Sequence, residues 1–174
     1  MMTLWQKIGL GLLLIGSLVG SGYFVSTFRG AQEVHYHAGF QMYDKGELLD
    51  FSGPEFMYLG ECGAMGHSFE TVRDRIHLHE RIGDVAHIHD DGVTWRNLFE
   101  SLNREDLIKN LDWVIVEGSV VDDEEVLDRV IDSYERVVFV TNQSEIDAAK
   151  LWEGMISEEY IREVEEASLN CNPV

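Results

Sequence analysis

The chain has 174 residues, enough for one domain with its own core, and a hydrophobic content of 45% argues against a disordered chain. Its formal net charge of -19 comes from 13 basic and 32 acidic side chains. Such a surface repels phosphate backbones, which speaks against nucleic acid as a partner. An acidic, lysine-poor surface is also typical of salt-adapted proteins, so the charge alone assigns no function.

The N-terminus predicts a membrane anchor. Residues 8–28 contain no charged side chain, and a helix of that length spans about 31 Å, close to the thickness of a bilayer core. We therefore expect residues 1–7 in the cytoplasm and residues 8–28 as an uncleaved signal anchor in the cytoplasmic membrane. Lys7 favours this orientation, which places the rest of the chain outside the cytoplasm. A cleaved signal peptide is the alternative.

The predicted anchor also contains two glycines spaced four residues apart. Gly16 and Gly20 form a G-x-x-x-G pattern, which packs transmembrane helices closely in some proteins. The pattern raises the hypothesis of a homodimer, or of a membrane-protein partner, that contacts this helix.

After a linker at residues 29–32, the pattern predicts an α+β domain over residues 33–142 and a helical C-terminal tail over residues 143–174. Residues 33–43 alternate strictly between apolar and polar, which indicates a half-buried strand. Strands are expected at 47–51, 75–80, 85–89, 113–121 and 136–141, and helices at 94–102, 122–133, 144–155 and 157–167, with Thr94 as an N-cap. The sum is one small domain of mostly antiparallel strands with packed helices.

Six of the seven histidines occur as three His-x-His pairs: His35 and His37, His77 and His79, and His87 and His89. Residues i and i+2 of a strand point to the same face, so each pair projects both imidazoles together. The residues between them are apolar and face the opposite way. We therefore expect the histidines to line a surface or a cleft outside the core.

A hairpin over residues 75–89 would bring two of these pairs together. A three-residue loop at Ile82-Gly83-Asp84, with a left-handed glycine, places His79 opposite His87 and His77 opposite His89. Four imidazoles then form a square patch. The pair in residues 35–37 joins the patch only if its strand lies beside this hairpin.

Clustered histidines disfavour protonation of one another, and neutral imidazole is a ligand for copper and zinc. We therefore predict a transition-metal site, copper or zinc, with His77, His79, His87 and His89 as primary ligands. Asp91 and Glu33 share the parity of neighbouring pairs and could add a carboxylate ligand or orient a ring. Two alternatives remain: a plain polar strand face, and an uncoordinated pH-sensing cluster.

Known catalytic patterns do not fit well. The run His87-Ile88-His89-Asp90-Asp91 matches the start of the H-x-H-x-D motif of the metallo-β-lactamase fold, but Gly92 stands where that motif has a histidine. The cupin pattern also fails. A membrane-anchored metalloenzyme with an open coordination position stays an alternative, as does an interaction subunit of a membrane complex in which the histidines are incidental.

The two cysteines, Cys62 and Cys171, could form one disulfide outside the cytoplasm. Cys62, Met65 and His67 could instead act as soft copper ligands. Their spacing matches no blue-copper pattern, so the disulfide is the preferred hypothesis.

Two segments resemble a family of small, single-pass, membrane-anchored prokaryotic proteins of unassigned function. They are HYHAGFQMYDKGELLDFS and RIHLHERIGDVAHIHDDGVTWRNLFESLN, at residues 35–52 and 75–103. The resemblance implies an exported, anchored domain with a histidine site at His77, His79, His87 and His89, and it implies no reaction. The function that we expect is binding or handling of a transition metal outside the cytoplasm.

Overall fold

A computed structural model describes residues 33–59 and 69–168 of the chain. The expected signal anchor with its G-x-x-x-G spacing, both cysteines, Met65 and His67 lie outside these ranges. Among the helices within them, none combines the length and apolar content that a membrane span needs. The anchor, its helix contacts and the disulfide therefore stay predictions.

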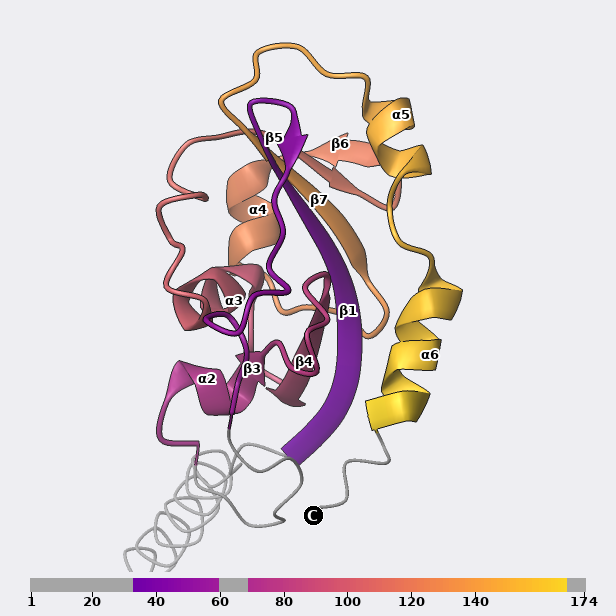
Figure 1. The fold of residues 1–174 in the computed structure, drawn as a ribbon. Coiled ribbons are helices and arrows are strands. Elements are labelled where there is room, and N and C mark those ends of the chain that lie inside the picture. Colours follow the sequence, from indigo (N-terminus) through magenta and orange to yellow (C-terminus); the bar gives the residue numbers. More distant parts are fainter. Residues whose placement is uncertain (1–32, 60–68, 169–174) are drawn as a thin grey trace, which may run out of the picture. The chain divides into compact units, whose positions relative to one another are not determined.

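The described residues form a seven-stranded mixed sheet (Figure 1). Its strands are β1 (Glu33–Asp44), β2 (Glu47–Leu48), β3 (Ile76–His77), β4 (Val85–Asp90), β5 (Leu111–Val116), β6 (Ser119–Val121) and β7 (Arg136–Thr141). They lie in the order β3-β4-β1-β7-β5-β6, with β2 paired to the end of β1. Only β1 and β7 pair in parallel among these strands. The prediction of an α+β domain with mostly antiparallel strands is confirmed.

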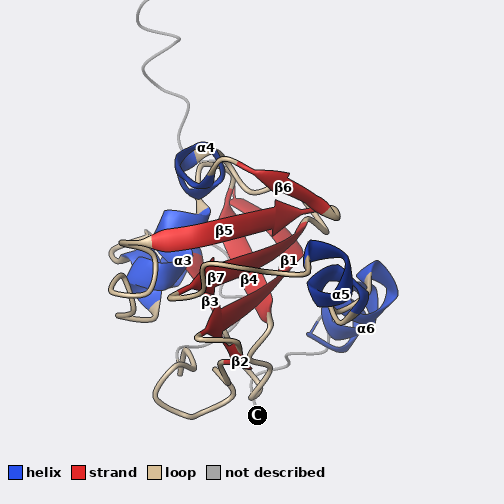
Figure 2. Cartoon of the chain, turned by 90° about the horizontal axis from the view of Figure 1, so that it is seen from above, coloured by secondary structure: helices blue, strands red, loops and turns tan. Residues whose placement is uncertain are grey.

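Helices cover both faces of the sheet (Figure 2). They are α2 (Val72–Arg75), α3 (Trp95–Ser101), α4 (Asp123–Asp128), α5 (Ala148–Glu153) and α6 (Glu158–Ser168). The first three lie on one face and the last two on the other. Because successive side chains of a strand point to opposite faces, the central strands pack against α2, α3 and α4 on one face and against α5 and α6 on the other.

The face toward α3 and α4 holds the larger core. Ala38, Phe40 and Met42 of β1 are fully buried in it, at 0% exposure. The Phe40 ring lies 6.2 Å from the rings of both Trp95 and Phe99 of α3. Thr94 caps this helix as predicted, because its hydroxyl accepts from the Asn97 amide while the Asn97 side chain accepts from the Thr94 amide.

The opposite face is covered by α5 and α6. Helix α6 buries Ile161, Val164 and Ser168, spaced three and four residues apart, so one stripe of this helix faces the sheet. Gly39 of β1 lets α6 approach closely. A Cβ at this position would stand 2.8 Å from the Cδ1 atoms of Ile156 and Ile161.

Five expected elements are shorter or divided. Of the expected strand 75–80 only Ile76–His77 pairs as β3, and of the expected helix 144–155 only Ala148–Glu153 is helical. The expected strand 113–121 is two strands, because Glu117 and Gly118 adopt left-handed backbone angles and reverse the chain. The expected helix 122–133 ends at Asp128, since Ile131 leaves it to donate its amide to the Val93 carbonyl at 3.1 Å. The partner strand expected at 47–51 keeps only Glu47–Leu48.

Candidate metal centre

Three histidines form a row across three adjacent strands. His87 of β4 lies opposite His37 of β1 on one side and opposite His77 of β3 on the other. Neighbouring strands lie about 4.8 Å apart, so such a row places imidazoles side by side. The ring centroid of His87 is 4.3 Å from that of His37 and 5.4 Å from that of His77. Strand β1 therefore lies beside β4 and brings the first His-x-His pair into the cluster.

The remaining three rings also surround His87. Its ring centroid is 4.1 Å from that of His79, 4.5 Å from that of His35 and 4.8 Å from that of His89. The register between β1 and β4 shifts at this point, so that Val34 and His35 face the single residue His89. Such a bulge turns side chains locally. All six paired histidines thus form one cluster, and His87 is its centre.

The predicted hairpin register is wrong by two residues. His77, and not His79, lies opposite His87. Leu78 leaves the hairpin, since its carbonyl accepts from the Tyr58 amide at 2.7 Å, and the left-handed residues Glu80 and Arg81 then turn the chain. A shift by two residues preserves which face each side chain points to, so the clustering prediction survives the error.

Gly83 has a different role from the one expected. It is not left-handed, because only Gly46 and Gly118 have positive φ angles among the described glycines. A Cβ at Gly83 would instead stand 2.5 Å from the Ser52 backbone nitrogen. The residue is small because it packs against the chain at Phe51 and Ser52.

Helix α2 and the segment before it position His77. The Nδ1 atom of His77 lies 2.7 Å from the Arg73 carbonyl oxygen, which can only accept, so Nδ1 carries the proton and Nε2 is left with its lone pair. The Tyr58 ring stacks on the imidazole at 4.3 Å, and the Tyr58 hydroxyl donates to Asp74 at 2.8 Å. A backbone carbonyl on the second nitrogen is the usual way to orient a metal-binding histidine.

Helix α6 covers His37 from the other side. The Ser168 hydroxyl lies 3.4 Å from His37 Nε2, and a Glu165 carboxylate oxygen lies 3.8 Å from His37 Nδ1. Glu165 also accepts a hydrogen bond from the Tyr134 hydroxyl. Neither Ser168 nor Glu165 was predicted as a site residue, because the turn that brings α6 over β1 leaves no signature near the histidine motifs.

The centre is more buried than predicted. His37, His77, His79 and His87 are 1%, 3%, 7% and 2% exposed, whereas His89 is half-buried and His35 is exposed. The expectation of a surface or open cleft is therefore wrong for four of the six rings. Their strand parity is nevertheless as predicted, because Leu78 and Ile88 lie in the core on the opposite face.

Burial keeps these imidazoles neutral. Loss of solvent, followed by repulsion from neighbouring histidines, lowers the pKa of His37 to about 3 and that of His89 to about 4. Burial likewise lowers the pKa of His77 to about 3, although the hydrogen bond to Arg73 opposes this. The pKa of His87 is lowered most strongly, by burial and then by four of the five histidines around it, His79, His37, His77 and His89. Neutral rings have a lone pair to offer to a metal.

Within the described part of the chain, two groups of three histidines are compact enough to hold an ion. One is His35, His37 and His87, and the other is His77, His87 and His89. Within each group, one nitrogen per ring lies within 4.8 Å of the others. His87 belongs to both groups, and His79 belongs to neither.

Asp91 and Glu33 were suggested as additional metal ligands because they share the strand parity of neighbouring histidines. Asp91 is exposed in the turn after β4 and belongs to neither of the compact groups found among the described residues. Glu33 begins β1, where its backbone pairs with Asp90. Their roles as extra ligands stay predictions.

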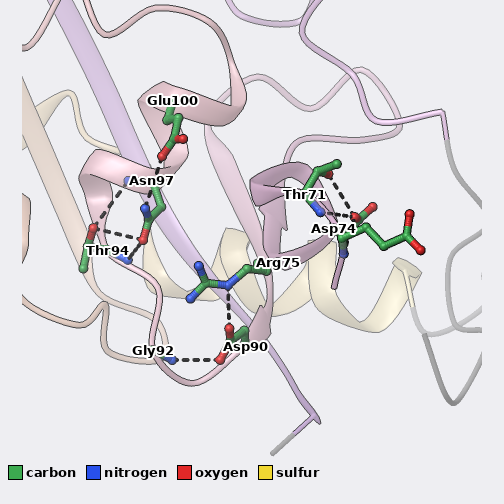
Figure 3. A network of polar contacts seen from close by, with 9 residues as sticks. Thr71, Asp74, Arg75, Asp90, Gly92, Thr94, Asn97 and Glu100 are labelled. Atoms are coloured by element: carbon green, nitrogen blue, oxygen red, sulfur yellow. Dashed lines mark hydrogen bonds and ion pairs between the residues drawn. The ribbon is translucent and has the colours of Figure 1, made fainter. Parts of the chain in front are cut away.

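The end of β4 is held on the other side of the sheet by a separate polar network (Figure 3). Arg75 Nε donates to an Asp90 carboxylate oxygen at 2.5 Å, and the Gly92 amide donates to the other oxygen at 3.1 Å. Beside it, the amide and hydroxyl of Thr71 donate to Asp74 and close the first turn of α2. The network fixes β4 and α2, the elements that carry His89 and orient His77.

Comparison of the chain with models of protein families, with curated protein sequences and with solved structures gave no match. The resemblance of residues 35–52 and 75–103 to a family of anchored prokaryotic proteins stays a prediction. The function of the chain is therefore inferred from the geometry of its histidines.

Proposed function

We propose that the chain binds a transition-metal ion, copper or zinc, through its paired histidines and holds it at the outer face of the cytoplasmic membrane. The observation that carries the proposal is the state of His77. Its Nδ1 proton is bound to a backbone carbonyl, and its Nε2 atom is buried without a hydrogen-bond partner in the cluster. A bound metal ion would use that lone pair.

A plain polar strand face explains this arrangement poorly. Four buried ring nitrogens have no hydrogen-bond partner among the described residues: His37 Nδ1, His77 Nε2, His79 Nδ1 and His87 Nδ1. Each unsatisfied buried polar atom costs about 1–3 kcal/mol, and such atoms are rare in native proteins. Their concentration in one cluster favours a ligand that satisfies several nitrogens at once.

The donor set supports copper or zinc. The compact groups consist of imidazole nitrogens alone, which suit zinc and copper better than the oxygen-loving ions magnesium and calcium. Copper(II) generally binds nitrogen ligands more tightly than the other divalent first-row metals, and zinc readily forms tetrahedral sites with nitrogen ligands. An all-imidazole donor set therefore suits both metals.

Metal handling is favoured over catalysis by the packing. Tyr58 stacks on His77 and α6 lies over His37, so protein covers the centre from two sides. The exposed His35 offers a route by which an ion could enter and leave. The uncharged stretch at residues 8–28 supports attachment to the membrane.

The metal content of the purified full-length chain tests this proposal. The protein, loaded with zinc or copper and then desalted, should retain the metal stoichiometrically, whereas His77→Ala/His87→Ala should retain little. Asp128→Asn is a matched control, because Asp128 lies on α4, across the sheet from the histidines. Circular dichroism checks that each variant is folded. A folded wild-type protein that retains neither metal would contradict the proposal.

A further inference from the structure

One ion cannot use all the available histidines. The two compact groups together contain five rings, whereas a zinc or copper site usually takes three or four protein nitrogens. An ion bound by His35, His37 and His87 would leave the Nε2 atom of His77 buried without a partner. An ion bound by the other group would in turn leave His37 Nδ1 unsatisfied.

His87 offers both of its nitrogens. Its Nε2 atom is in hydrogen-bond contact with the Nε2 atom of His35, and its Nδ1 atom is buried without a hydrogen-bond partner among the described residues. The two nitrogens of an imidazole ring point in diverging directions, so a single ring can bind one ion through each. His87 lies on β4 between β3 and β1, so His37 of the first group and His77 of the second lie on opposite sides of it.

We propose that the centre is dinuclear, with His87 bridging two metal ions as an imidazolate. One ion is held by His35, His37 and His87 Nε2, and the other by His77, His89 and His87 Nδ1. This inference rests on the proposed metal-binding function and adds its stoichiometry. The ions are divalent copper or zinc, alone or mixed.

The chemistry of the bridge balances without a redox partner. Neutral His87 carries one ring proton, and binding of the second ion replaces that proton at the ring nitrogen, so one proton is released to solvent. A bound dication strongly favours loss of a proton from its ligand. The negative imidazolate then reduces the repulsion between the two dications. Glu165, 3.8 Å from His37 Nδ1, adds further negative charge beside the first position.

Metal stoichiometry tests the inference on the full-length chain. Titration with zinc(II) or copper(II), read by elemental analysis after desalting, should saturate at two ions per chain. His35→Ala/His37→Ala and His77→Ala/His89→Ala should each retain one ion, because each removes only one position. Asp128→Asn should retain two. A wild-type protein that saturates at one ion would overturn the dinuclear centre and leave the proposed function standing, whereas no bound metal would overturn both.

The bridge itself has a spectroscopic signature. Two copper(II) ions joined by an imidazolate couple magnetically, so the protein loaded with two copper ions should show a much weaker electron paramagnetic resonance signal than two isolated ions would. Either paired variant, with one copper ion, should show the full signal of an isolated site. A full signal from the doubly loaded wild type would show that His87 does not bridge.

Discussion

Strands β1 and β4 present two chemically opposite faces. Toward α3 they place Ala38, Phe40 and Ile88, all fully buried among aromatic side chains. Toward α6 the same strands place His37 and His87, equally buried, each with one ring nitrogen that has no hydrogen-bond partner among the described residues. One residue along the strand separates the two environments, because the pleat sends neighbours to opposite sides.

The difference shows how a small domain can hold an unsatisfied site. The apolar face supplies the burial that stabilises the fold, and the histidine face carries groups that disfavour folding until a ligand satisfies them. Metal binding would then stabilise the folded chain by mass action. Perturbing each face in turn separates their contributions, and the largest effect is expected from acid.

Acid should destabilise the metal-free protein through the histidine face. His37 and His77 have pKa values of about 3 in the folded chain, against about 6.5 when unfolded. The unfolded chain therefore binds more protons between these values, so stability falls as the pH drops below about 6.5. At pH 5 each of these two buried histidines should cost roughly 2 kcal/mol, which is about 4 kcal/mol for the two. His87 adds to this loss, because burial and neighbouring histidines lower its pKa as well. Urea unfolding at pH 7.5 and pH 5 measures this loss.

A histidine substitution sharpens the same experiment. His77→Gln removes one titrating ring, so the difference in unfolding free energy between the two pH values should shrink by roughly 2 kcal/mol. Equal stability of the metal-free wild type at pH 7.5 and pH 5 would show that the buried rings do not disfavour protonation.

The apolar face should dominate stability at neutral pH. Phe40→Ala removes a ring that is 0% exposed and lies 5.6 Å from the Phe51 ring. We expect a loss of about 3–5 kcal/mol, from lost burial and the cavity left behind. Leu48→Ala, at 52% exposure, is the control and should cost under about 1 kcal/mol. Chemical denaturation at pH 7.5 measures both, and similar losses would contradict the division between the faces.

From the sequence, the face of the sheet to which a side chain points was easier to predict than the residue that lies opposite it on the next strand. Strict alternation is enough to assign side chains to a face, so the separation of Leu78 and Ile88 from the histidines was predictable. The hairpin register was not, because the withdrawal of Leu78 depends on a backbone hydrogen bond to Tyr58, which is distant in sequence. Strand order was likewise out of reach, and with it the central position of His87.

That helix α6 covers the histidine cluster could not be predicted from the sequence either. Burial of the rings depends on α6, whose Glu165 and Ser168 lie far from every His-x-His motif in sequence. Helix α6 itself was predictable from its apolar spacing, but the strand against which it packs was not. Gly39, which permits that packing, sits within an ordinary alternating strand and has no local signal.

The smallest expected effect concerns the polar pair Arg75–Asp90. Asp90 has a side chain only 9% exposed, and both of its oxygens accept hydrogen bonds, from Arg75 and from the Gly92 amide. Arg75→Gln should therefore cost about 1–3 kcal/mol, because it weakens the pairing of a buried carboxylate. Arg96→Gln is the matched control. Its pair with Asp128 is exposed on both sides, so the loss should be about 0–1 kcal/mol.

The Arg75 variant also tests whether the two faces act independently. Asp90 ends β4 one residue after His89, so a loosened strand end could move that ring although Arg75 bonds to Asp90 and not to His89 itself. If the faces are independent, Arg75→Gln lowers the free energy of unfolding but leaves the zinc affinity of the folded chain within about twofold of wild type. A tenfold loss of affinity would show that the network positions His89 through β4. Adding Asp90→Asn distinguishes the causes, because it removes the unpaired charge and should recover stability even where it cannot restore the position of the ring.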